Sequence, residues 1–184
     1  MKKLLVAVLV VVAAVILFRA ISRLASSPAM PKPAPQSEAR FGPADIYPDA
    51  ARTPGEANPD ITPENVGQTI CNPAWSTRLV RPSVHYTSSL KMQQLREYGY
   101  ADLNPRDYEE DHLIPLEIGG HPSDPKNLWP EPYETSIPDG GARFKDKVEN
   151  YLHEQVCAGN ISLREAQQEI AADWYRVYAT RVAH

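Results

Sequence analysis

The stretch Tyr108–Pro132 reads YEEDHLIPLEIGGHPSDPKNLWPEP. It opens on an acidic run that ends in the adjacent pair Asp111 and His112, and a proline and two consecutive glycines then indicate a turn. Asn127 follows fifteen positions after His112. An Asp-His pair alone is usually polar surface, but an acid, an imidazole and an amide spaced around a turn favour a site that carries chemistry.

Two helices are predicted after this stretch. Residues spaced by four predict the apolar stripe of a helix that ends at Gly159, namely Phe144, Val148, Leu152 and Val156. Ser162 and Glu165 then form a capping box, and apolar residues continue at helical spacing to near the C-terminus. Shorter helices are expected upstream, over residues 63–70 and from Thr87 or Ser88 to Tyr98.

The sequence motifs resemble a known nuclease signature. The acid-Asp-His run, the apolar-apolar-Pro step, the Gly-Gly turn and the later Asn-Leu resemble HNH endonucleases, the ββα-metal or His-Me finger family. With KDKVENYLHEQVCAG and SLREAQQEIAADWY, the chain is similar to an exported bacterial subgroup over roughly Thr62 to Tyr178. The resemblance implies an α+β fold with a hairpin-plus-helix core, flanking helices and metal-dependent hydrolysis of DNA or RNA phosphodiester bonds.

The same resemblance implies a role for each residue of the motif. His112 would be the general base, because an imidazole with a pKa near neutrality can take a proton from water. Asp111 would offer a hard oxygen ligand to a divalent metal ion, with Mg²⁺ expected. Asn127 would tie the two strands together and orient His112, so we place it with the catalytic group.

The chain departs from the family at the second metal ligand. HNH enzymes usually place a His or Asn near the start of the crossing helix, and here residues 138–144 read PDGGARF. The candidate substitutes are Asp139, Asp146, Glu149 and His153, of which Glu149 and Asp146 are favoured as metal ligands. Lys145 on the same helix is expected to support catalysis.

Cys71 and Cys157 are the only cysteines and are separated by 86 positions. Outside the cytoplasm they are expected to form a disulfide, worth roughly 4 to 5 kcal/mol in the chain-entropy model. Two cysteines without a CxxC motif do not make a four-ligand zinc site.

The N-terminus has the pattern of an export signal. Two lysines precede fifteen apolar residues, Leu4 to Phe18, and arginines follow. We assign residues 1–24 to a signal peptide or membrane anchor, 25–61 to a proline-rich flexible linker, and 62–184 to the HNH-like domain. The domain is therefore expected outside the cytoplasm, either anchored to a membrane or secreted or periplasmic.

The charge balance leaves other functions open. From Pro63 onward there are 12 Lys and Arg against 18 Asp and Glu, an unusual excess of acid for a protein that binds nucleic acid. A basic group in one sequence region could supply phosphate contacts if it shares a face: Arg78, Arg81, Lys91 and Arg96.

Two rival functions remain. One is a catalytically impaired HNH-like domain that acts as a tethered extracellular binding module. The other is a hydrolase of another phosphodiester or a cell-wall polymer, in which Glu110 and Glu117 act as paired carboxylates. The sequence contains no GxxxxGK, GxGxxG or GxSxG, so it offers no motif for a nucleotide cofactor or a serine hydrolase.

Overall fold

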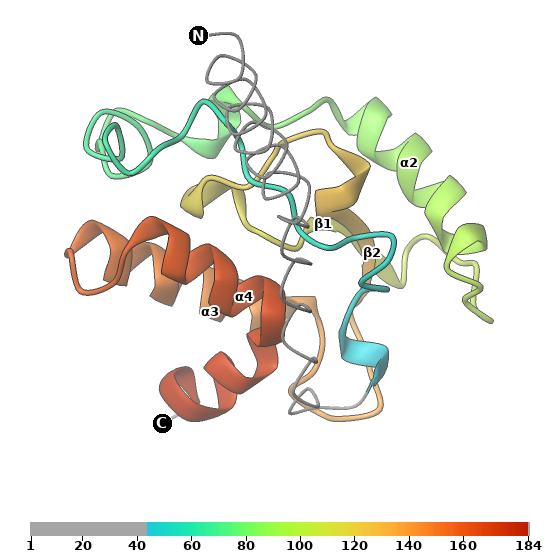
Figure 1. Cartoon of the computed structure of the whole chain (residues 1–184). Coiled ribbons are helices and arrows are strands. Elements are labelled where there is room, and N and C mark those ends of the chain that lie inside the picture. The colour runs from blue at the N-terminus through green and yellow to red at the C-terminus, as the bar shows by residue number, and fades with distance from the viewer. Residues whose placement is uncertain (1–43, 184) are drawn as a thin grey trace, which may run out of the picture. The chain divides into compact units, whose positions relative to one another are not determined.

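The structure is a computed structural model that describes residues 44–183. Within them the chain forms a mixed α+β fold of three α-helices and a two-stranded antiparallel sheet (Figure 1). The α+β class expected from the sequence is confirmed. The predicted signal peptide or membrane anchor, residues 1–24, lies outside the described residues. No helix within residues 44–183 is long and apolar enough to cross a membrane.

The sheet is a hairpin of β1, Tyr108–His112, and β2, Leu128–Pro132. The strands pair antiparallel with Asp111 opposite Trp129. Figure 1 shows the hairpin in the middle of the fold, with α2 on one side and α3 and α4 on the other. The acidic run and its histidine therefore end a central strand, close to the helices that follow in sequence.

Two consecutive glycines allow the loop between the strands to turn tightly. It contains two short 3₁₀ turns, Leu116–Ile118 and Pro125–Asn127. Gly119 has a φ of 75°, which favours glycine, and a Cβ added to Gly120 would lie 1.7 Å from the carbonyl oxygen of Ile114. The turn expected at the glycine pair is confirmed, and the second glycine is required because backbone approaches it closely.

The two helices predicted at the C-terminal end are confirmed. They are α3, Ala142–Cys157, and α4, Leu163–Val177, and a π-helical turn, Tyr178–Val182, follows. Ser162 caps α4 as expected, since the backbone N–H of Glu165 donates to Ser162 Oγ at 3.2 Å, the first of the two hydrogen bonds of a capping box. The apolar faces of α3 and α4 contribute much of the core through Val148, Leu152, Val156, Leu163, Ala166, Ile170 and Trp174.

Helix α2, Val84–Glu97, begins earlier than predicted. The expected cap at Thr87 or Ser88 is wrong, because Ser83 caps the helix and its Oγ accepts the backbone N–H of Tyr86 at 3.3 Å. Ser83 follows a proline and has the extended backbone of an N-cap residue.

The helix predicted over residues 63–70 is wrong, because this segment forms successive turns instead. The side chain of Asn65 accepts the backbone N–H of Thr62 at 2.9 Å and donates to the carbonyl oxygen of Asp60 at 2.9 Å. Such side-chain bonds compete with the helical pattern, which explains why a good start signal is not followed by a helix.

Residues 44–61, which we call the N-terminal strap, pack against the fold. Ile46 and Tyr47 are buried in the core, and Trp174 Nε1 donates to the carbonyl oxygen of Ile46 at 2.8 Å. Thr53 Oγ1 donates to the carbonyl oxygen of Leu128 at 3.1 Å. The flexible linker was expected to reach residue 61, whereas the structure places this last part of it in the folded unit.

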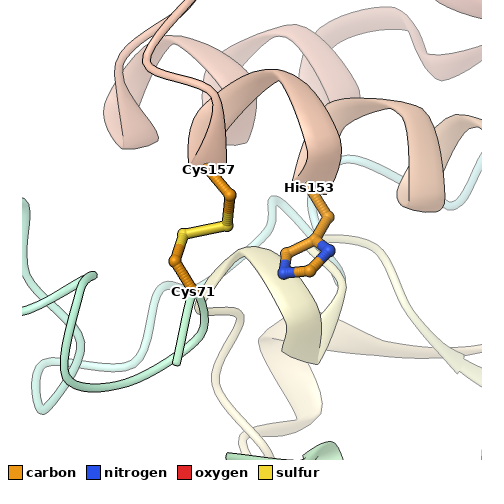
Figure 2. A group of neighbouring side chains, drawn as sticks. All are labelled: Cys71, His153 and Cys157. Carbon is orange, nitrogen blue, oxygen red and sulfur yellow. A yellow bond between two sulfur atoms is a disulfide. The ribbon is translucent and has the colours of Figure 1, made fainter. Parts of the chain in front are cut away.

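The predicted disulfide between Cys71 and Cys157 is confirmed (Figure 2). It joins the turns that follow the N-terminal strap to the last residue of α3. The bond therefore braces the same helix that carries Lys145 and Glu149.

Candidate active site

A buried lysine organises the junction between the hairpin and α3. The side chain of Lys145 is completely buried, and its ammonium donates three hydrogen bonds. The acceptors are Asp111 Oδ2 at 2.6 Å, the carbonyl oxygen of His112 at 2.8 Å and Glu149 Oε1 at 2.5 Å. An ammonium has three N–H groups, so every donor of Lys145 is used. The lysine fixes the end of β1 against α3.

The two carboxylates that contact Lys145 have opposite protonation preferences. Burial alone would raise the pKa of Asp111, but the ammonium of Lys145 and hydrogen bonds hold this pKa down, at about 2. Burial raises the pKa of Glu149 to about 8, and Lys145 offsets this only in part. Burial opposes the charge of Lys145, yet the surrounding carboxylates outweigh it and raise the pKa of the lysine. At neutral pH, Asp111 is the ionised partner and Glu149 is largely protonated.

Glu131 on β2 is a third carboxyl group beside the lysine, and the sequence analysis missed it. The residue is 1% exposed, and Oε2 lies 3.9 Å from Lys145 Nζ. Neither carboxyl oxygen has a hydrogen-bond partner of ordinary geometry within the described residues. Burial raises the pKa of Glu131 well above its usual value, and the nearby charge of Asp111 raises it further. Burial and the charge of Asp111 therefore both favour the protonated form of Glu131.

His112 is held as a neutral imidazole. The residue is 3% exposed, and burial lowers its pKa despite the nearby charge of Asp111. Its Nε2 lies 2.9 Å from the carbonyl oxygen of Pro122. A carbonyl only accepts, so Nε2 carries the hydrogen and Nδ1 keeps the lone pair. The structure thus fixes the tautomer in which Nδ1 can act as a base.

Asn127 locks the loop that carries Pro122. It is fully buried, its Nδ2 donates to the carbonyl oxygens of Ile114 and His121 at 2.9 and 3.0 Å, and its Oδ1 accepts the backbone N–H of Ile114 at 2.9 Å. The side chain therefore ties loop segments to each other. Its role is to position the backbone around His112, and none of these hydrogen bonds involves the imidazole.

A small pocket of about 80 Å³ opens beside Asp111, His112 and Glu149. It is lined by Thr77, Arg81, Asp111, His112, Pro115, Leu116, Glu117 and Glu149. Glu117 comes from the first 3₁₀ turn of the loop, and burial raises the pKa of this carboxyl group as well. The pocket thus combines a neutral histidine, three carboxyl groups and one guanidinium.

Other candidate metal ligands lie outside the pocket. Asp146 occupies an exposed position on α3, although partial burial and the charge of Asp111 raise its pKa. Asp139 accepts a hydrogen bond from the Tyr178 hydroxyl at 3.3 Å. His153 lies beside the disulfide (Figure 2), and neither it nor Asp139 or Asp146 lines the pocket.

The basic residues considered in the sequence do not form one cluster at the site. Arg81 lines the pocket, and Arg78 is exposed nearby in sequence. Lys91 donates to two backbone carbonyls at 2.8 and 2.9 Å, and Arg96 donates to one at 3.0 Å. Arg81 is the residue of this group that lines the pocket.

Glu110 and Glu117 do not line one pocket. Both carboxyl oxygens of Glu110 are buried without a hydrogen-bond partner among the described residues, and burial raises its pKa to about 8. Glu117 lines the small pocket, and Glu110 does not. The paired-carboxylate alternative therefore gains no geometric support.

The fold and the site define a mixed α+β protein with an acidic pocket and a neutral, tautomer-fixed histidine at the end of a β-hairpin. No family model matches this chain, and no curated protein or solved structure matches it significantly. The geometry of the site is therefore the basis for a functional proposal.

Proposed function

We propose that the chain is a metal-dependent endonuclease of HNH type, which hydrolyses phosphodiester bonds of DNA, or of RNA, outside the cytoplasm. The observation that supports this most is the tautomer of His112. Its Nε2 hydrogen is held by the carbonyl oxygen of Pro122, and the imidazole lines a pocket with three carboxyl groups and an arginine. The ββα arrangement of the family corresponds to β1, β2 and α3 in this proposal.

His112 takes a proton from a water molecule at Nδ1. The lowered pKa of the buried ring keeps it neutral at neutral pH, which a general base requires. The hydrogen bond from Nε2 to Pro122 stabilises the positive charge that the ring gains on accepting the proton. Asn127 maintains the loop geometry on which that hydrogen bond depends.

The pocket suits a hard divalent ion such as Mg²⁺. Asp111, Glu117 and Glu149 line one pocket of about 80 Å³, and their carboxylate oxygens are the ligands that such ions prefer. Their oxygens do not all lie within 4.8 Å of one another, so the side chains would move closer around a bound ion, and the ion would displace the proton of Glu149. Mg²⁺ usually keeps several waters and uses only one or two carboxylates, so three side chains around a small pocket are sufficient. When bound, the ion would offset negative charge on the phosphate and stabilise the leaving oxygen. Asp146, which we had expected as a ligand, has no direct part in this arrangement.

Two cations of the chain complete the proposal. Arg81 lines the pocket and would contact the phosphate oxygens of the substrate. Lys145 uses all its donors within the protein, so it acts as a positioning residue that keeps Asp111 ionised. The disulfide agrees with an oxidising environment, such as the periplasm or the cell exterior.

A second candidate, the tethered binding module, is favoured by one observation. Lys145 already contacts two of the expected metal ligands, Asp111 and Glu149. The ammonium of Lys145 already offsets the negative charge of these carboxylates, so it takes the place that a metal ion would fill. Without the ion, the fold would remain but the site would not hydrolyse phosphodiester bonds. Cleavage in the presence and absence of metal separates the two functions.

The decisive experiment is a cleavage assay of the full-length chain, purified with its disulfide in a mild detergent. Plasmid, linear duplex DNA and RNA are incubated with Mg²⁺, Mn²⁺ or EDTA. Two variants are compared, His112→Ala and the matched control His85→Ala, whose histidine lies exposed on α2.

We expect metal-dependent cutting, a loss of about 100-fold or more for His112→Ala, and no loss for His85→Ala. Circular dichroism and a thermal melt of each variant check that the fold survives. If folded wild-type chain cuts no substrate with any metal, the nuclease proposal fails. Gel-shift binding without cutting would then favour the binding module.

A further inference from the structure

We propose that the chain, when its disulfide is reduced, holds a soft divalent metal ion such as Zn²⁺ between Cys71, His153 and Cys157. The ion would take over the bracing role of the disulfide. This site lies outside the acidic pocket, and the proposal does not depend on nuclease activity.

The three side chains already converge. One potential ligand atom from each lies within 4.8 Å of the other two, and within residues 44–183 this is the one such group of three His, Cys, Asp or Glu side chains. His153 and Cys157 are four positions apart on α3, which places them on one face of the helix. Figure 2 shows both projecting from α3 toward the segment that carries Cys71.

The imidazole is anchored at this place independently of the sulfur atoms. His153 Nε2 lies 2.9 Å from the carbonyl oxygen of Ile70, the residue before Cys71. This contact holds the ring beside Cys71 whether or not the sulfurs are bonded. Zn²⁺ binds thiolate at about 2.3 Å and imidazole at about 2.0 Å, so its ligand atoms lie roughly 3 to 4 Å apart. Small movements of the side chains bring the group into that range.

The chemistry makes the site conditional on redox state. In the oxidised chain the sulfurs of Cys71 and Cys157 are bonded to each other, and neither is a thiolate. A phosphine reductant cleaves the S–S bond with two electrons and leaves two thiols, while the phosphine becomes its oxide with oxygen from water. Zn²⁺ then displaces the two thiol protons, and water fills the fourth position. Cys157 is exposed, so both reductant and ion can reach it.

The donor set determines which ion the site selects. Two thiolates and an imidazole are soft or borderline ligands that favour Zn²⁺ and Co²⁺ over Mg²⁺. The carboxylates of the acidic pocket have the opposite preference. A spectroscopic signal specific for thiolate therefore distinguishes the two sites in one protein.

The test is a Co²⁺ titration of the full-length chain in mild detergent, after reduction with a phosphine and removal of the excess. We expect thiolate-to-cobalt charge-transfer absorption that saturates at one ion per chain and disappears when Zn²⁺ displaces Co²⁺. Zn²⁺ should also raise the Tm of the reduced chain. The oxidised chain should show neither effect.

One variant and two controls test the histidine ligand. His153→Gln, which keeps the disulfide, should weaken Co²⁺ binding by the reduced chain at least about tenfold. His85→Gln, at an exposed histidine of α2, and His112→Ala, in the acidic pocket, should both bind as wild type does. Circular dichroism during the titration shows whether the binding species is folded.

Three results would overturn the proposal. The first is a reduced wild-type chain that gives no charge-transfer absorption. The second is a His153→Gln chain that binds as tightly as wild type. The third is metal binding by the unfolded chain without recovery of structure.

Discussion

Replacing Lys145 with methionine tests whether this lysine stabilises the fold mainly by compensating the charge of Asp111. Met has a similar length and no charge, so Lys145→Met keeps most of the volume and removes the three hydrogen bonds to Asp111, His112 and Glu149. Removing one partner of a buried ion pair costs about 3 to 5 kcal/mol. We count this cost for the pair with Asp111 only. Glu149 is largely protonated at neutral pH, so Asp111 is the charge that the substitution leaves uncompensated.

The loss should appear in a thermal melt as a decrease in Tm of about 10 to 15 °C at pH 7. Lys147→Met is the matched control. Lys147 lies two residues away on α3, is exposed, and contacts the ring of Phe144 at 4.6 Å, so its loss should cost less than about 1 kcal/mol.

The pH dependence gives the sharper test, measured in EDTA to exclude metal. In the wild type the pKa of Asp111 is about 2, below its ordinary 3.8, so its stabilising contribution is present above pH 3.8 and lost only as pH falls toward 2. In Lys145→Met, burial without the ammonium raises the pKa of Asp111 above its value in the unfolded chain. The ionised carboxylate then destabilises the variant at neutral pH, and protonation relieves this as pH falls.

The free-energy deficit of Lys145→Met should therefore be greatest near pH 7 and shrink as the pH approaches 4. Urea unfolding at several pH values measures it directly. A deficit below about 1 kcal/mol at pH 7, or one that stays constant down to pH 4, would refute the view that Lys145 mainly compensates Asp111.

Three further predictions concern the scaffold. Gly120→Ala should destabilise the fold by at least about 3 kcal/mol in urea unfolding, since its Cβ would collide with backbone, whereas Gly67→Ala, with open space around it, should not. Replacing both Cys71 and Cys157 with serine should lower stability by about 4 to 5 kcal/mol, and a loss below about 1 kcal/mol would contradict the loop-closure account. Asn127→Ala should lower cleavage activity and cost about 2 to 4 kcal/mol, because it leaves buried backbone groups unpaired; an unchanged Tm would contradict this.

The turn at the glycine pair and the two C-terminal helices could be predicted because their signals are local, whereas the hairpin was expected only from the resemblance to HNH endonucleases. The glycine pair, the capping box at Ser162 and the four-residue stripe from Val148 to Val156 each depend on neighbours within one or two turns. The disulfide could be predicted by elimination, since only two cysteines exist. In each case the deciding interaction is encoded close to the residues that make it, or the chain offers no alternative.

The packing of the N-terminal strap could not be predicted in this way. Its composition is typical of a flexible linker, and only Ile46, Tyr47 and Ile61 among its residues are large, apolar and buried. Their burial depends on partners far along the chain, such as Trp174, which donates to the backbone of Ile46. No local pattern distinguishes such a segment from an unstructured linker of the same composition.

Glu131 shows the same limit within the site. It lies between two prolines in the motif, where nothing indicates a completely buried carboxyl group. The register places Glu131 opposite Glu109, and α3 brings Lys145 to 3.9 Å from its carboxyl group. Only the tertiary structure therefore reveals that burial raises the pKa of Glu131.

Helix α3 carries residues of the acidic pocket near its N-terminal end and a cysteine of the disulfide at its C-terminal end. Lys145, Glu149, His153 and Cys157 follow at intervals of four, so one face of α3 runs from the acidic pocket to the disulfide. The segment from Cys71 to Ser83 returns from that disulfide to the pocket, where Arg81 forms part of the wall. Two of the three segments that line the pocket are thus covalently joined at Cys71 and Cys157. Apart from the intervening polypeptide, this disulfide is the covalent connection between the two segments, so we expect it to help hold Arg81 in the pocket wall beside α3.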